Sequence, residues 1–186
     1  MARGIVAIGA SWGGVHAIGS VLRALPDDFP VPIAVAQHRS EDHPTRLADT
    51  LGRRSPIRVV EATDKETLHR GFAYLAPPGY HLLVERGSVS LSTDDQVLFS
   101  RPSIDVLFES VADAYGEDAV GVILTGASDD GAAGLARIRR RGGVTVVQEP
   151  ATAERRTMPD AALAGGRAHR VLALDEIGPF LVKVCG

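Results

Sequence analysis

The sequence lacks the features of a secreted, disulfide-bonded or membrane-embedded protein. Its 186 residues include one cysteine, Cys185, so no disulfide can form within the chain and a reducing compartment is expected. Long hydrophobic runs are also missing. The apolar stretch of residues 4–10 is too short for a membrane helix, and it lacks the cleavage site of a secretion signal. These absences predict a cytoplasmic protein that does not insert into a membrane.

Neither sign of charge is in strong excess. The chain has 20 Lys and Arg against 23 Asp and Glu, which gives a formal net charge of −3. This balance provides no general attraction to nucleic acid or to a membrane surface, so no nucleic-acid partner is expected. The 45% hydrophobic and 23% charged content is that of an ordinary soluble globular protein. A chain of this length fits one domain, which we expect over residues 1–186.

Short, largely apolar runs alternate along the chain with segments of helical periodicity. Strands are expected at residues 4–8, 32–36, 57–60, 72–76, 119–124, 144–147 and 171–174, and helices at residues 15–25, about 44–54, 104–115, 131–141, 158–163 and from 175 onward. Strands that are apolar on both faces indicate a parallel sheet covered by helices on both sides. Residues 81–85 and 88–92 flank Arg86-Gly87 and predict a hairpin. We therefore expect a doubly wound α/β fold, with a mostly parallel sheet, helices on both faces and an antiparallel hairpin at the edge.

Polar side chains follow three of the expected strands. Ser11 follows the first strand, His38 follows the second, and Asp129 and Asp130 follow the strand that ends at residue 124. Because ligands of parallel α/β sheets bind outside the carboxyl ends of the strands, we expect these groups on the same rim of the sheet. A serine, a histidine and an aspartate in one place are the groups of a hydrolytic triad.

Ser11 lies in a Gly-x-Ser-x-Gly pattern, residues 9–13, at the expected turn from strand to helix. The glycines allow a sharp turn that exposes the serine oxygen, and the N–H groups at the start of the helix can stabilise an oxyanion. A tight turn in which Ser11 only caps the helix is an equal alternative for this pattern alone. Dinucleotide binding is disfavoured, because Gly-x-Gly-x-x-Gly is absent and Gln37-His38 stands where an acidic residue is needed.

The remaining candidate groups favour structural roles. The histidines at positions 16, 43, 69, 81 and 169 show no metal-ligand spacing, and a single cysteine makes no zinc cluster. Either Asp129 or Asp130 is expected to cap the helix that follows them. Nothing near Cys185 in the sequence would lower the pKa of its thiol. No metal or cofactor site is therefore predicted.

Several short segments carry a resemblance to a known family. They are Gly9-Ala10-Ser11 with Gly13-Gly14, Gln37-His38, Tyr74-Leu75-Ala76-Pro77 with His81, Arg101-Pro102-Ser103-Ile104-Asp105-Val106-Leu107-Phe108, Gly121-Val122-Ile123-Leu124-Thr125-Gly126, Asp130-Gly131-Ala132-Ala133-Gly134 and Met158-Pro159. In this order, over nearly the whole chain, they resemble the catalytic domain of CheB-type chemotaxis methylesterases. Each match is short, but together they are highly specific.

The resemblance implies both a reaction and a set of residues. It places the catalytic triad on Ser11, His38 and Asp130, and it selects Asp130 over Asp129. The implied activity is hydrolysis of methyl esters on glutamate side chains of methyl-accepting chemoreceptors, and often deamidation of receptor glutamines, with no cofactor or metal. The implied partners are the cytoplasmic helices of those receptors and a separate response-regulator domain. Family members often have an N-terminal receiver domain, so we expect a stand-alone form or a trimmed chain.

Three positions depart from the family pattern. Trp12 stands where threonine is common, and Arg39 and Ala127 stand where methionine is usual. Backbone N–H groups that stabilise an oxyanion are kept when a side chain changes. The fit of the substrate depends on side chains and can change with them. We expect the Ser11 oxygen within hydrogen-bond reach of one ring nitrogen of His38, or slightly beyond it, with the other nitrogen facing Asp130. The Trp12 ring is expected at the rim of the cleft, with packing against a neighbouring loop as an equal alternative. The alternative function is a binding module of the same fold that recognises a receptor or signalling partner without turnover.

Overall fold

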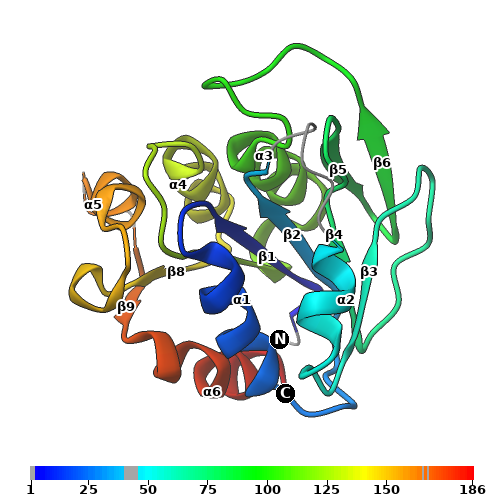
Figure 1. The fold of residues 1–186 in the computed structure, drawn as a ribbon, viewed down its shortest axis with the longest axis horizontal. Helices are drawn as coiled ribbons and strands as arrows, with labels where there is room; N and C mark the ends of the chain where they lie inside the picture. The colour runs from blue at the N-terminus through cyan, green and yellow to red at the C-terminus, as the bar shows by residue number, and fades with distance from the viewer. Residues whose placement is uncertain (1–2, 40–45, 165, 167) are drawn as a thin grey trace.

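The computed structural model describes residues 3–39, 46–164, 166 and 168–186, and a seven-stranded sheet lies at its centre (Figure 1). The strands are β1 (Ile5–Ala10), β2 (Ile33–Gln37), β3 (Arg58–Glu61), β4 (Phe72–Leu75), β7 (Ala119–Ile123), β8 (Val144–Gln148) and β9 (Arg170–Leu172). Their order across the sheet is β3-β4-β2-β1-β7-β8-β9, and every neighbouring pair is parallel.

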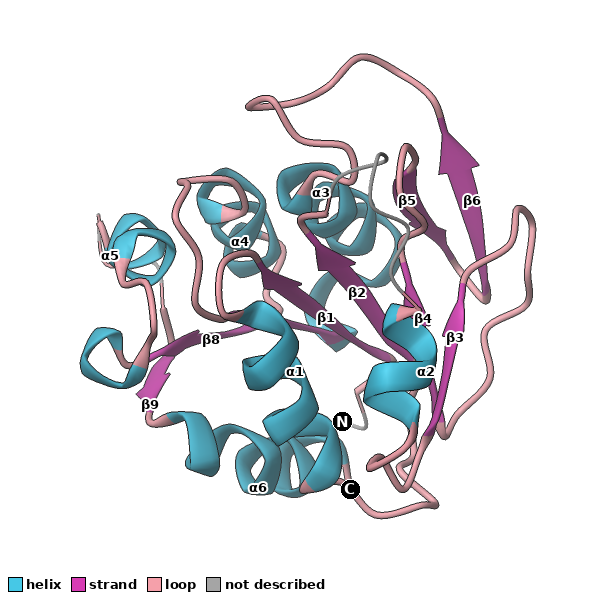
Figure 2. Cartoon of the chain, in the orientation of Figure 1, coloured by secondary structure: helices cyan, strands magenta, loops and turns pink. Residues whose placement is uncertain are grey.

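Helices cover both faces of this sheet (Figure 2). They are α1 (Gly14–Arg23), α2 (Leu47–Gly52), α3 (Ile104–Tyr115), α4 (Ala132–Arg140), α5 (Thr157–Leu163) and α6 (Leu174–Cys185), with 3₁₀ turns η1 (Gly116–Asp118) and η2 (Pro150–Thr152). In β1, Val6 and Ile8 pack with α1, α2 and α6, while Ile5 and Ala7 pack with α3, α4 and α5. Strand β1 is buried on both sides for this reason, and the predicted doubly wound α/β fold is confirmed.

The predicted hairpin exists, but it forms a sheet of its own. Strands β5 (His81–Glu85) and β6 (Ser88–Ser92) pair with each other in a separate two-stranded sheet, and the edges of the large sheet are β3 and β9. Leu82, Val84 and Val89 pack in the same apolar cluster as α3. The Val84 N–H donates to Ser110 Oγ of α3 at 2.9 Å. The hairpin therefore lies against α3 instead of extending the edge of the main sheet.

The expected elements differ from the observed ones mainly at their ends. The last strand was expected to reach residue 174, but it ends at Leu172 and Leu174 begins α6. The helix starts there because the Glu176 carboxylate accepts the Ala173 N–H at 2.9 Å, which caps its first turn. Residues 44 and 45 of the helix expected at 44–54 lie outside the described residues. Among the described residues, no helix is both long and apolar enough to cross a membrane.

The strand order brings three carboxyl ends together. β1 has β2 on one side and β7 on the other, so the chain leaves β1 in one direction and later returns on the opposite side. The register pairs Ala10 with Gln37 and Gly9 with Ile123. Ligands of such sheets bind at this change of direction. The segments that follow β1, β2 and β7 are therefore neighbours at one rim.

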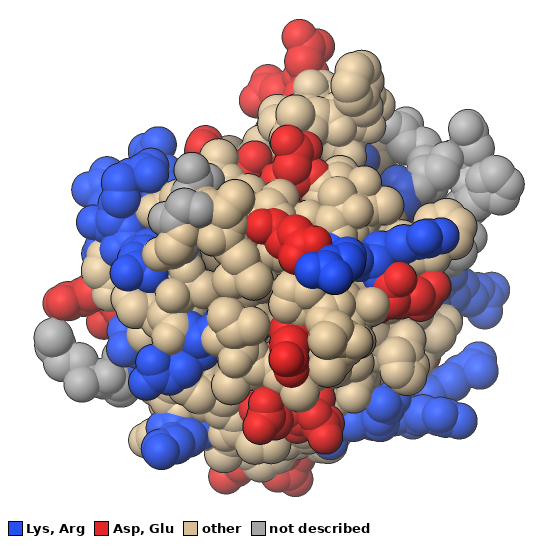
Figure 3. Space-filling model, turned by 90° about the vertical axis from the view of Figure 1, so that its left-hand side faces the viewer, with Lys and Arg blue, Asp and Glu red and all other residues tan. Residues whose placement is uncertain are grey.

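Arginine side chains gather on the side of the molecule formed by α4, α5 and β9 (Figure 3). Arg137 and Arg141 pair with Asp113 at 2.7 and 3.0 Å. Arg139 donates to the Ala168 carbonyl at 3.0 Å. Each of these contacts is made within the chain by a side chain that stays partly exposed at the end of α4.

Candidate active site

The turn after β1 is held on both sides of Ser11. Its N–H donates to the Thr125 carbonyl at 3.0 Å, and its carbonyl accepts from Gly14 N and Gln37 Nε2, each at 2.8 Å. Gly13 has φ 76°, a left-handed conformation that favours glycine. A β-carbon on Gly14 would lie 2.0 Å from Gln37 Oε1. These contacts fix the backbone of Ser11 at the start of α1.

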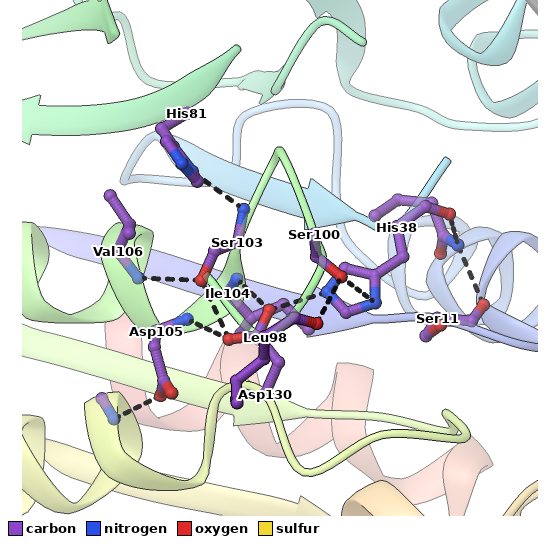
Figure 4. A network of polar contacts seen from close by, with 12 residues as sticks. Ser11, His38, His81, Leu98, Ser100, Ser103, Ile104, Asp105, Val106 and Asp130 are labelled. Carbon is purple, nitrogen blue, oxygen red and sulfur yellow. Dashed lines mark hydrogen bonds and ion pairs between the residues drawn. The ribbon is translucent and has the colours of Figure 1, made fainter. Parts of the chain in front are cut away.

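His38 meets a buried carboxylate (Figure 4). Its Nε2 lies 2.7 Å from Asp130 Oδ2, and Asp130 is fully buried. An ionised carboxylate only accepts hydrogen bonds, so Nε2 carries the hydrogen and Nδ1 of the neutral ring is an acceptor. The Ser100 hydroxyl lies 3.4 Å from Nδ1 and is placed to donate to it. His38 therefore presents Nδ1 as a base that a hydroxyl can reach.

The carboxylate of Asp130, which precedes α4 in the chain, lies against the N-terminus of α3. It accepts the backbone N–H groups of Ile104 and Asp105, at 2.7 and 2.9 Å, and the hydroxyl of Ser103 at 2.9 Å. Burial by itself raises the pKa of Asp130, but the hydrogen bonds from His38 and from the two N–H groups outweigh it, so the pKa lies below its ordinary value. Asp130 is therefore ionised at neutral pH, as a partner of a protonated histidine must be.

A second carboxylate, on α3, accepts a hydrogen bond from the N-terminus of α4. Asp105, in the first turn of α3, accepts the Gly134 N–H of α4 at 2.7 Å. Burial and the neighbouring Asp130 charge raise the pKa of Asp105 to about 6, against the hydrogen bond from Gly134. Gly134 lets the helices approach, because a β-carbon there would lie 2.6 Å from Phe108 Cβ. The two helices therefore cap each other through Asp130 and Asp105.

His81 joins the hairpin to the start of α3. This side chain is 1% exposed; its Nδ1 accepts the Ser103 N–H at 3.1 Å, and its Nε2 donates to the Asp95 carbonyl at 3.0 Å. It thereby holds Ser103, whose hydroxyl contacts Asp130. Within the described part of the chain, no group of three or more His, Cys, Asp or Glu is placed to hold a metal ion.

Comparison with known proteins agrees with this architecture. The model of the CheB methylesterase family matches residues 6–181. The chain belongs to the CheB methylesterase family. The crystal structure of the Thermotoga maritima CheB methylesterase catalytic domain superposes with a TM-score of 0.93 and 32% sequence identity, over 98% of this chain and 99% of that one.

Curated relatives of the CheB family are similar in sequence as well. A putative protein-glutamate methylesterase/protein-glutamine glutaminase of Leptospira interrogans (strain Fiocruz L1-130) is 42% identical over 183 residues, which are 96% of this chain and 93% of that protein. The protein-glutamate methylesterase FrzG of Myxococcus xanthus is 42% identical over 180 residues, 96% of this chain and 54% of that protein. The chain thus spans nearly all of one relative and about half of the other.

In this CheB-family domain the two adjacent acids have different environments. Asp130 is buried against His38, whereas Asp129 is exposed. The expectation that one of them caps its own helix was wrong. α4 has Gly131 at its N-cap with no side-chain hydrogen bond, and Asp130 caps α3 instead. The carboxylate turns to α3 because His38, Ser103 and two N–H groups satisfy it there.

No hydrogen bond joins Ser11 to His38 in the described part of the chain, so the expected approach of the Ser11 oxygen to a ring nitrogen stays a prediction, whereas the other nitrogen, Nε2, faces Asp130 as expected. Among the described residues, Ser11 hydrogen bonds only through its backbone, and Ser100 contacts Nδ1 of His38. Sequence reasoning did not single out Ser100, because nothing local relates it to a histidine 62 residues earlier. Ser103 is the N-cap of α3, where its hydroxyl accepts from Val106 N at 3.4 Å, and the same hydroxyl donates to Asp130.

The three departures from the CheB pattern lie in different surroundings. Trp12 is 58% exposed; its Nε1 donates to Glu154 Oε1 at 2.9 Å, and the Arg155 guanidinium lies 5.4 Å from the ring centroid. Its ring is at the surface next to Ser11 and contacts a neighbouring loop. Arg39 binds Glu61 Oε1 and the Ala76 carbonyl, each at 2.7 Å, through Nη2. Ala127 is exposed.

Proposed function

We propose that this CheB-family chain hydrolyses methyl esters of glutamate side chains in methyl-accepting chemoreceptors, with Ser11, His38 and Asp130 as its catalytic triad. The observation that carries the proposal is the His38–Asp130 contact of 2.7 Å, which directs Nε2 to a buried carboxylate and leaves Nδ1 as an accepting base. The sheet order, which puts the end of β1 between the ends of β2 and β7, supports Ser11 as the nucleophile.

The reaction follows from these roles. Ser11 Oγ attacks the ester carbonyl while Nδ1 of His38 takes the hydroxyl proton. Asp130 remains ionised and stabilises the imidazolium. His38 then gives the proton to the departing methoxide, which leaves as methanol, and an acyl-enzyme remains on Ser11. Water, deprotonated by His38, releases the glutamate and restores the serine.

Backbone groups of the nucleophile turn are suited to the oxyanion. The Trp12 N–H directly follows Ser11 and has no hydrogen-bond partner among the described residues. It also lies at the start of α1, where the helix dipole favours negative charge. We assign it as an oxyanion donor. The substitution of threonine by Trp12 leaves this N–H in place.

The same steps describe deamidation of a receptor glutamine, with ammonia in place of methanol. Several relatives of this chain carry the joint name protein-glutamate methylesterase/protein-glutamine glutaminase. We propose the cytoplasm as the location, residues 1–186 as one catalytic domain, and the cytoplasmic helices of receptors as partners, with a separate response-regulator domain. The reaction as written uses side chains and water and needs no cofactor.

Methanol release tests the proposal. Purified protein is incubated with a methylated cytoplasmic fragment of a chemoreceptor, and the Ser11→Ala variant serves as the matched control. Wild-type protein should release methanol and should be labelled on Ser11 by a serine-directed phosphonate, and the variant should do neither. Binding of the fragment without methanol release would instead favour the non-catalytic binding module.

A further inference from the structure

A two-residue hairpin lies in the segment between β6 and α3. Val97 and Ser100 exchange two backbone hydrogen bonds, of 3.2 and 2.9 Å, which leaves Leu98 and Phe99 as the loop. Both have positive φ, 49° and 61°. Turns with positive φ at both central positions favour Asn-Gly, because a β-carbon is strained in this conformation. A leucine followed by a phenylalanine is an unfavourable choice for the turn itself.

The side chains of this turn gain little burial in return. Phe99 is 96% exposed, and Leu98 keeps 46% of its surface exposed. An apolar side chain in water and a strained backbone both work against the folded chain, and neither is offset inside the described structure. We call Leu98 and Phe99 the hairpin tip. An apolar leucine and phenylalanine are favourable at the hairpin tip only if another molecule covers them.

The stem of the hairpin is held in place. Arg101 Nη1 donates to the carbonyls of Thr93 and Asp94, at 2.9 and 3.1 Å, and His81 Nε2 donates to the Asp95 carbonyl at 3.0 Å. The tip is therefore presented on a supported segment. A surface that is held before binding loses less conformational freedom when it binds.

The hairpin tip lies at the candidate active site. Ser100, which closes the hairpin, has its hydroxyl 3.4 Å from Nδ1 of His38, and Leu98 lies beside them (Figure 4). A small ester needs only to reach Ser11 and His38, so it would leave the exposed side chain of Phe99 in water. Only a substrate that extends beyond the ester group can cover Phe99.

We propose that the hairpin tip is a docking element for the polypeptide that carries the methyl ester, and that it binds an apolar surface next to the esterified glutamate. The inference rests on the proposed function, because it is the ester substrate that brings this polypeptide to His38. The tip lies next to the catalytic groups, and a second copy of the chain bound to it would cover the site. The partner that we assign to the tip is therefore the substrate polypeptide.

The test compares two substrates and two tip variants. Leu98→Asn with Phe99→Gly installs the residues that the turn favours, and Phe99→Ser removes only the exposed ring. With a methylated receptor fragment, both variants should lose about tenfold or more in kcat/KM, mainly through KM, as exposed aromatic anchors do. With p-nitrophenyl acetate, both should match the wild type. Only the double variant should have a raised Tm, because only it relieves the strain.

The control is Val171→Ser, which changes an apolar side chain of β9 that is 47% exposed, and it should alter neither kcat/KM. Unchanged kcat/KM for the receptor fragment in the tip variants would overturn the docking role alone. An equal loss on both substrates would also overturn it, since the tip would then support catalytic geometry. A wild-type dimer in sedimentation that the variants lose would assign the tip to a second copy. No methanol release by the wild type would overturn the proposed function, and docking with it.

Discussion

Replacement of Asp105 by asparagine isolates the effect of one buried charge on stability. Asp105 is 9% exposed, and its carboxylate accepts the Gly134 N–H at 2.7 Å. Burial, Asp130 and Glu109 raise its pKa from 3.8 to about 6, against the backbone N–H groups of Gly134 and Gly131. Asparagine keeps an oxygen that accepts the Gly134 N–H, and it removes the charge. The variant therefore changes the titration while it preserves the contact between α3 and α4.

The magnitude follows from the two pKa values. A carboxyl group whose pKa is raised on folding binds its proton more tightly in the folded state, so its stabilising effect is complete below pH 3.8 and is lost as the pH rises through about 6. At about 1.4 kcal/mol per pKa unit, the ionised Asp105 costs the folded state about 3 kcal/mol above that range. Relative to Asp105→Asn, the wild type should therefore lose about 3 kcal/mol of unfolding free energy across this range.

Urea unfolding at a series of pH values between about 4 and about 8 measures this difference. Asp129→Asn is the matched control, because Asp129 is exposed and its variant should follow the wild-type curve. At neutral pH, Asp105→Asn should be the more stable protein. Curves of wild type and Asp105→Asn that stay parallel across the whole range would refute the assignment of a buried, destabilising charge to Asp105.

Two further predictions concern the rim of the sheet. Asp130→Asn should lower kcat on methylated receptor fragment by about three to four orders of magnitude, because His38 would lose its orienting carboxylate, while Asp129→Asn should change it little; the opposite ranking would show that the wrong acid was assigned. Trp12→Thr should lower the unfolding free energy by about 1 kcal/mol or less, through loss of the Glu154 and Arg155 contacts, and should change KM for the receptor fragment; equal KM values across several receptor substrates would mean that the ring only packs.

Local patterns sufficed for most of the fold. Apolar runs predicted the buried strands because both faces of the sheet are covered there, and the helical periodicity of residues 104–115 predicted α3. The place of the hairpin was not predictable in this way. Alternating Leu82, Val84 and Val89 require one apolar partner surface, but the pattern does not say whether that surface is a sheet edge or a helix.

The candidate site was likewise predicted from the sequence only in part. The sequence pattern at the ends of β1, β2 and β7 predicted Ser11, His38 and the pair Asp129 and Asp130 on one rim, since the carboxyl ends of parallel strands share an edge. The preference for Asp130 over Asp129 came from family resemblance, because both precede the same helix. Ser100 was missed, since its approach to His38 depends on a hairpin whose turn residues, Leu98 and Phe99, are not those that turns favour.

The sequence alone determined the parallel sheet, its helical cover and the rim that collects the polar groups, because burial patterns and glycine turns act over a few residues. Tertiary packing decided the chemistry of the rim. The approach of α3 to α4 at Gly134 brings Asp130 to the N–H groups of Ile104 and Asp105, and this directs Nε2 of His38 to the carboxylate. Contacts between residues so far apart in the chain depend on how whole elements pack, and no local pattern encodes that.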